Sequence, residues 1–177
     1  MAKSRVDIQL SQKHQQAIGR VCAEWANLEF AARWSIAELT KLDLNTALIL
    51  TNSSNIQSWL DILGNLCRAN PELTNKGERF VKIKKDILDL IGLRNDVVHG
   101  LWFVNPQLVN WKTSKLKKLR KDVPSYSWAF PKRGKTVVSH NVFTADEINK
   151  IAIKIGRQGA NLSDLFLAPN KWPSTPA

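Results

Sequence analysis

Apolar residues recur at steps of three and four from about Ser11 to Leu42, and this spacing constrains the fold more than any other feature of the chain. Such spacing gathers the apolar side chains into one stripe along an α-helix. Ser11 is a residue type that caps helix starts, and no proline interrupts the segment. The sequence therefore predicts a long amphipathic helix whose buried stripe is Ile18, Val21, Cys22, Trp25, Leu28, Ala32, Ile36 and Leu39.

Two shorter helical segments follow this first helix. A turn near Asp43 leads to an apolar run over 46–50, which predicts a short helix. After a polar break, helical spacing resumes over 54–69 and ends where Pro71 disfavours the helical conformation of the residue before it. We expect a short helix, a break and then a helix of about four turns.

Helical spacing appears twice more in the chain. It covers 78–99, where Gly100 follows directly and supplies a residue typical of helix C-terminal ends. The last predicted helix spans about 144–168, because Thr144 and Glu147 have the spacing of a capping box. Short links between the helices favour a mainly α fold, an up-and-down bundle of four to five helices.

The segment 101–141 has a different composition from the helices around it. It contains three prolines and three tryptophans, and short apolar runs in it are typical of strands. We expect a small β-hairpin or an irregular insertion between the last two long helices. A chain of 177 residues is long enough to bury one core, so 1–177 is predicted to be a single domain.

The two cysteines, Cys22 and Cys67, both lie within apolar helical patterns. Buried free thiols in a reducing compartment are the expected outcome. There is no Cys-x-x-Cys pair, so the sequence supports neither a zinc site nor a redox site, and we expect no metal and no cofactor.

The N-terminal residues 1–9 are polar and lack the apolar centre of a signal peptide. Apolar stretches elsewhere are much shorter than the ~20 residues that cross a bilayer. These observations predict a cytoplasmic protein with no membrane association.

The formal net charge of +11 predicts an anionic partner. Residues 112–135 hold nine basic side chains against Asp122 alone, which accounts for +8 of the total. Such a patch attracts RNA phosphates, and the aromatic residues among the lysines can stack on unpaired bases. A solvated lysine face remains the alternative. The predicted RNA-binding residues are Lys112, Lys115, Lys117, Lys118, Arg120, Lys121, Lys132, Arg133 and Lys135.

His99 stands apart from the other two histidines, because His14, expected to be exposed, and His140 have no partner in the sequence. Asn95 lies one helical turn before His99, on the same face, and Arg94 is next to it. A histidine can move protons near neutral pH, and an arginine can hold a phosphate and stabilise charge that develops on it. These functions suit phosphodiester cleavage. A histidine that only caps the helix end is the alternative.

The segment Arg94-Asn95-Asp96-Val97-Val98-His99 resembles the Arg-x(4–6)-His signature of HEPN domains, and its place at the end of a long helix is also similar. The first helix looks like the opening helix of bacterial HEPN-like proteins through Gly19, Trp25, Leu28 and Glu29.

This resemblance implies a metal-independent ribonuclease of the kind found in toxin–antitoxin and phage-defence systems. Two chains would form a homodimer with one composite site, and cleavage would use the RNA 2′-hydroxyl. His99 would be the acid or base, Arg94 would hold the phosphate and Asn95 would orient the site. An antitoxin protein would be a further partner.

Two acidic residues are candidates for a supporting position at this site. Glu29 fits if the first helix packs against the helix that carries Arg94, with a surface or capping position as its alternative; Asp96 lies about a quarter-turn from Asn95. Two other functions stay open. One is a non-catalytic RNA-binding or assembly module that uses 112–135. The other is a site where a nucleotide is bound or modified.

Overall fold

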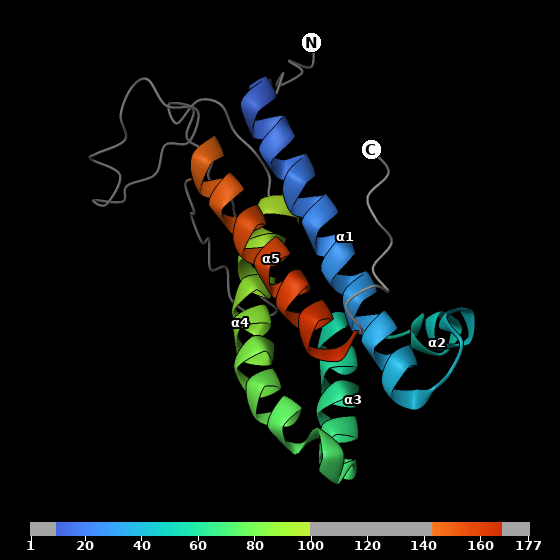
Figure 1. The fold of residues 1–177 in the computed structure, drawn as a ribbon. Helices are drawn as coiled ribbons and strands as arrows, with labels where there is room; N and C mark the ends of the chain where they lie inside the picture. Colours follow the sequence, from blue (N-terminus) through green and yellow to red (C-terminus); the bar gives the residue numbers. More distant parts are fainter. Residues whose placement is uncertain (1–9, 100–142, 168–177) are drawn as a thin grey trace, which may run out of the picture.

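The structure, a computed structural model, describes residues 10–99 and 143–167 (Figure 1). The described chain forms helices and contains no strand within these ranges. The expected insertion over 101–141, with the whole basic segment 112–135, lies outside the described residues. The helices are α1 (Gln12–Thr40), α2 (Leu44–Thr51), α3 (Ile56–Ala69), α4 (Thr74–His99) and α5 (Ala145–Phe166), with a 3-10 turn, η1 (Pro71–Leu73), before α4.

Helix α1 confirms the long amphipathic helix that the sequence predicts. Ser11 is its N-cap, and the predicted stripe is buried at Val21 and Leu28, neither of which exposes any surface. The helix ends at Thr40, and its C-cap residue, Lys41, adopts a left-handed backbone conformation with φ of 60°. The prediction for Cys22 was wrong, because this thiol is exposed. Its position follows Val21 by about 100° around the helix, which turns it away from the core.

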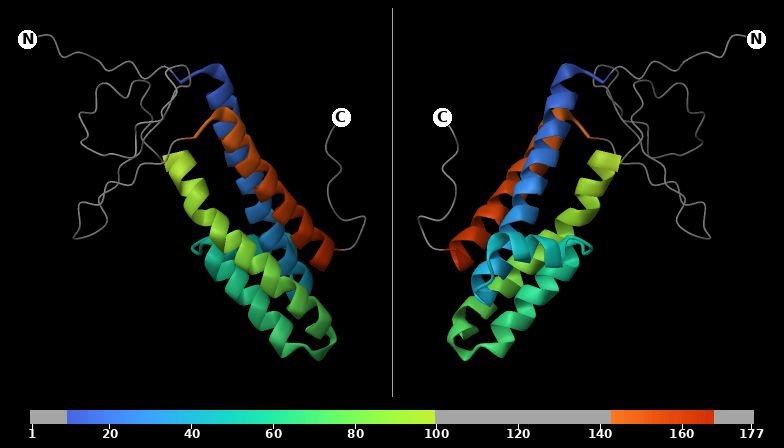
Figure 2. Two further views of the ribbon diagram at one scale, coloured as in Figure 1. Left: turned by 90° about the vertical axis from the view of Figure 1, so that its left-hand side faces the viewer. Right: turned by 90° about the vertical axis from the view of Figure 1, so that its right-hand side faces the viewer.

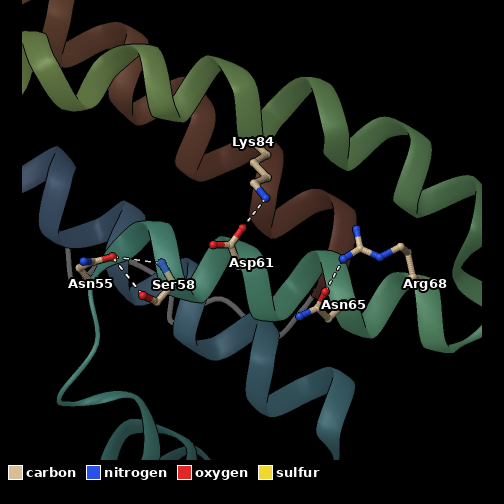
Figure 3. A network of polar contacts seen from close by, with 6 residues as sticks. All are labelled: Asn55, Ser58, Asp61, Asn65, Arg68 and Lys84. Atoms are coloured by element: carbon tan, nitrogen blue, oxygen red, sulfur yellow. Dashed lines mark hydrogen bonds and ion pairs between the residues drawn. The ribbon is translucent and has the colours of Figure 1, made fainter.

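Helices α3 and α4 form an antiparallel pair (Figure 3). The side chain of Asn55 caps α3 by accepting a hydrogen bond from the Ser58 backbone N–H at 3.1 Å. Lys84 Nζ of α4 lies 2.6 Å from Asp61 Oδ1 of α3, which ties the two helices together near their middle.

Helix α4 begins at Thr74, one turn before the predicted start near position 78. The 3-10 turn η1 leads directly into it, since the Asn70 side chain accepts the backbone N–H of Glu72 at 3.1 Å and starts that turn. Gly77 lies in the first turn of α4, where an added Cβ would come within 3.4 Å of Cys67 Cβ. A residue without a side chain therefore lets α4 approach α3 closely.

The long helices do not strictly alternate in direction. Glu24 of α1 lies beside Gly156 of α5, and Leu28 lies beside Gly159, so α1 and α5 run in the same direction. Figures 1 and 2 show both helices starting at the same end of the bundle. The predicted up-and-down order therefore holds for α3, α4 and α5 but not for α1. The reason is α2, which brings the chain back so that α3 runs the same way as α1.

The two glycines of α5, Gly156 and Gly159, allow close packing against α1. The helix continues through both, and α1 and α5 form the most extensive helix contact in the described chain. The core fills the space between α1, α3, α4 and α5, and includes an edge-to-face pair of Phe80 and Phe166 with ring centres 5.6 Å apart. At the start of α5, Thr144 and Glu147 form the predicted capping box.

The prediction that His14 is exposed was wrong. Its side chain is only 4% exposed, and its Nδ1 lies 2.7 Å from the Ser11 hydroxyl oxygen. Loss of hydration on burial lowers the pKa of His14, and a hydrogen bond with the Phe143 backbone opposes this effect. His14 thus belongs to the packing between the start of α1 and the residues that lead into α5.

Within the described ranges, no helix has the length and apolar character needed to cross a membrane.

Candidate active site

The last two turns of α4 bring Arg94, Asn95 and His99 together. Arg94 Nη1 lies 2.8 Å from His99 Nε2 and 3.0 Å from Asn95 Oδ1. A terminal guanidinium nitrogen carries two hydrogens, so Nη1 donates to both neighbours at once. Local helix geometry accounts for this arrangement, because Asn95 and His99 are four residues apart and share a face of α4, and the long Arg94 side chain reaches that face from the adjacent position. Arg94 therefore contacts both of the other residues that the sequence proposed for catalysis.

The contact with Arg94 determines which ring nitrogen of His99 accepts a hydrogen bond in this geometry. A guanidinium can donate hydrogen bonds but cannot accept them, so His99 Nε2 must accept from Nη1. The imidazole is then neutral, with its proton on Nδ1. His99 is exposed at the helix end, so its ring can meet a large substrate. A neutral, exposed imidazole is the form of histidine that can take up a proton.

Arg94 also reaches across the bundle to α1. Its Cζ lies 5.4 Å from the ring centre of Trp25, within the range of a cation–π contact. Trp25 is 4% exposed and thus forms a fixed platform. The Arg94 Nε is buried and has no hydrogen-bond partner within the described part of the chain. The same part contains no partner for Nη2, which leaves this group able to donate to an incoming anion.

Glu29 lies behind the Trp25 platform and makes no ion pair with Arg94 among the described residues. Its Oε1 accepts a hydrogen bond from Trp25 Nε1 at 2.7 Å. The bond fixes the orientation of the indole ring, and the ring in turn supports the guanidinium of Arg94. Glu29 therefore contacts Trp25 directly and acts on Arg94 only through Trp25. Asp96 is partly buried on α4 between Asn95 and the buried Val97.

Sequence reasoning missed Trp25 as part of the site, because it used this residue only for the core stripe and for the resemblance of the first helix. A signal for it exists: Trp25 and Glu29 are one turn apart on α1, a spacing at which their side chains meet. The contact with Arg94 joins residues of two helices and cannot be seen in local spacing. The nine basic residues predicted to bind RNA all lie outside the described residues.

Other groups with distinct chemistry lie away from this site. Cys67 lines a hollow of about 790 Å³ between α3 and α4, which does not include Arg94 or His99. Burial raises the pKa of the Cys67 thiol, against the opposing charges of Lys76 and Arg68, so the thiol stays protonated and is a poor nucleophile. Over 10–99 and 143–167, no three histidine, cysteine or acidic side chains are grouped so that they could hold a metal ion.

No protein-family model, no curated protein and no solved structure matches this chain. The chemistry of the site must therefore be argued from its own residues, and the HEPN resemblance stays a prediction.

Proposed function

We propose that the chain is a metal-independent endoribonuclease of the HEPN type, with Arg94 and His99 as its central catalytic pair. The observation that carries the proposal is the 2.8 Å contact between Arg94 Nη1 and His99 Nε2, at a site where Trp25 supports the guanidinium. A proton acceptor and a fixed cation in direct contact are what cleavage by an internal nucleophile requires. RNA supplies that nucleophile as its 2′-hydroxyl.

The proposed reaction begins when an RNA phosphate approaches Arg94. Nη2 donates to a phosphate oxygen, and Nη1 can then turn from His99 toward the same phosphate. This movement frees the lone pair of His99 Nε2, which takes the proton of the 2′-hydroxyl. The 2′-oxygen bonds to phosphorus and the bond from phosphorus to the 5′-oxygen breaks. The products are a 2′,3′-cyclic phosphate and a 5′-hydroxyl.

The leaving 5′-oxygen needs a proton, and one neutral histidine cannot act as base and acid at the same moment. A second copy of the chain solves this problem, since its own His99, once its contact with Arg94 is released, can carry a proton and supply it. The proposed homodimer therefore has a chemical role, because one copy of His99 acts as the base and the other as the acid. Asn95 holds Arg94 through Nη1, and Glu29 acts indirectly by fixing Trp25.

The test is incubation of the purified protein with mixed cellular RNA in EDTA, beside the variants His99→Gln and Arg94→Ala. His99 is exposed, so His99→Gln should keep the fold, and circular dichroism verifies this. We expect cleavage by the wild type alone, with cyclic-phosphate ends. Equal cleavage by His99→Gln would refute the proposal. Binding without any cleavage would favour the non-catalytic RNA-binding module instead.

A further inference from the structure

A second arginine is stacked on a tryptophan elsewhere in the bundle. Arg33 of α1 places its Cζ 5.0 Å from the ring centre of Trp59 in α3. Trp59 is 5% exposed, and its indole N–H donates to the Thr51 carbonyl oxygen at 3.0 Å, which fixes the ring. The guanidinium of Arg33 is thus held over a rigid aromatic surface in the same manner as that of Arg94.

The hydrogen-bonding groups of Arg33 are available to a ligand. Its Nε is buried without a partner, as in Arg94. No described residue forms a hydrogen bond or an ion pair with Arg33, and its two terminal nitrogens are not among the buried atoms that lack a partner. The Arg33 side chain is partly exposed at the surface. A cation held by stacking alone, with free donors, suits a planar match to an oxyanion such as a phosphate.

The two stacked arginines lie along the same side of the bundle. Trp25, Glu29 and Arg33 follow one another at four-residue steps and so share one face of α1. The partners that cover this face, Trp59 and Arg94, belong to the antiparallel pair of α3 and α4. Eight residues separate Trp25 from Arg33, which corresponds to about 12 Å along the helix. Arg33 therefore continues the face that starts at the candidate active site.

We propose that Arg33 binds a second backbone phosphate of a single-stranded RNA whose scissile phosphate lies at Arg94. This inference deepens the proposed function and rests on it. The stack on Trp59 limits the conformations of Arg33 before binding, so less side-chain entropy is lost when the phosphate is bound. Glu29 lies between the two arginines, and its carboxylate disfavours a phosphate at that intermediate position. The two phosphates are thus held at the two ends of the shared face.

The test measures binding of a fluorescein-labelled, 2′-O-methyl oligonucleotide, which cannot be cleaved because its 2′-oxygens are blocked. Arg33→Gln removes the charge, and Arg20→Gln is the matched control. Arg20 also belongs to α1, but its side chain is about half exposed and faces Glu24 at 3.9 Å. Fluorescence anisotropy over a series of salt concentrations gives both the affinity and its salt dependence.

We expect Arg33→Gln to weaken binding about tenfold, the effect of one charge-assisted hydrogen-bonded contact. It should also reduce the slope of log K against log salt by about 0.7, the contribution of one phosphate contact on a single strand. Arg20→Gln should change neither quantity by as much. Arg33→Lys keeps the charge, so it should restore most of the slope, which a purely structural effect of Arg33 would not do.

The outcomes separate this inference from the proposed function. An unchanged slope for Arg33→Gln, or a slope reduced equally by Arg20→Gln, overturns the Arg33 site even if the wild type cleaves RNA. An Arg33-dependent slope in a protein that cleaves no RNA supports the Arg33 site and refutes the ribonuclease. A wild-type protein that does not bind the oligonucleotide overturns the Arg33 site directly.

Discussion

The hydrogen bond from Trp25 to Glu29 should contribute measurably to stability, and Trp25→Phe tests this. Phenylalanine keeps an aromatic ring beneath Arg94 but removes the N–H that donates to Glu29 Oε1 at 2.7 Å. A hydrogen bond to a charged group is worth about 1.5–3 kcal/mol, and the smaller ring in this buried position costs about 1 kcal/mol more. We therefore expect the free energy of unfolding to fall by about 2.5–4 kcal/mol.

A double-mutant cycle with Glu29→Ala isolates the hydrogen bond from the loss of ring volume. The two variants should be coupled by about 1.5–3 kcal/mol, the value of the hydrogen bond, measured by urea denaturation with circular dichroism as the probe. Glu24→Ala is the matched control, since Glu24 faces α5 at Gly156 and should combine additively with Trp25→Phe. A coupling energy below about 0.5 kcal/mol between Trp25 and Glu29 would refute the argument, because independent sites add within that limit.

Three further predictions concern single residues. Gly92→Ala in α4 should raise the free energy of unfolding by about 0.5–1 kcal/mol in urea titrations, because an added Cβ meets no atom within 4 Å; a loss of stability would contradict this. Thr144→Ala should lower it by about 1 kcal/mol by removing the capping box, and an unchanged urea midpoint would count against that role. The pKa of His14 is lowered from 6.5 in the folded state, so the unfolded chain binds the proton first and stability should decline as the pH falls below about 6.5. Replacement of His14 by Asn should flatten this decline in thermal melts between about pH 8 and pH 5.5, and an equally steep decline in the variant would exclude His14 as its cause.

Features governed by local chemistry were predictable from the sequence. The buried stripe of α1, the cap at Ser11 and the capping box at Thr144 each depend on residues within one or two turns. The cluster of Arg94, Asn95 and His99 belongs to the same class, because a single helix end positions all three.

Features that depend on packing between helices were not predictable in the same way. His14 is buried because Phe143, far away in the sequence, lies against it. Cys22 is exposed because the neighbouring helices cover Val21 and leave the next position open. The parallel course of α1 and α5 arises from α2, and local periodicity carries no information on the direction in which helices pack.

The antiparallel packing of α4 against α5 has a consequence for how this architecture can change. Asp86 of α4 lies beside Gln158 of α5, with Oδ2 and Nε2 3.2 Å apart, and α4 ends at the same end of the bundle at which α5 begins (Figure 2). A connection between these two helix ends has no need to span the bundle. Each doubling of a flexible connection costs only about 0.6 kcal/mol of closure entropy. The sequence between α4 and α5 can therefore be lengthened, replaced or shortened, in evolution or by protein engineering, without a change to the helices.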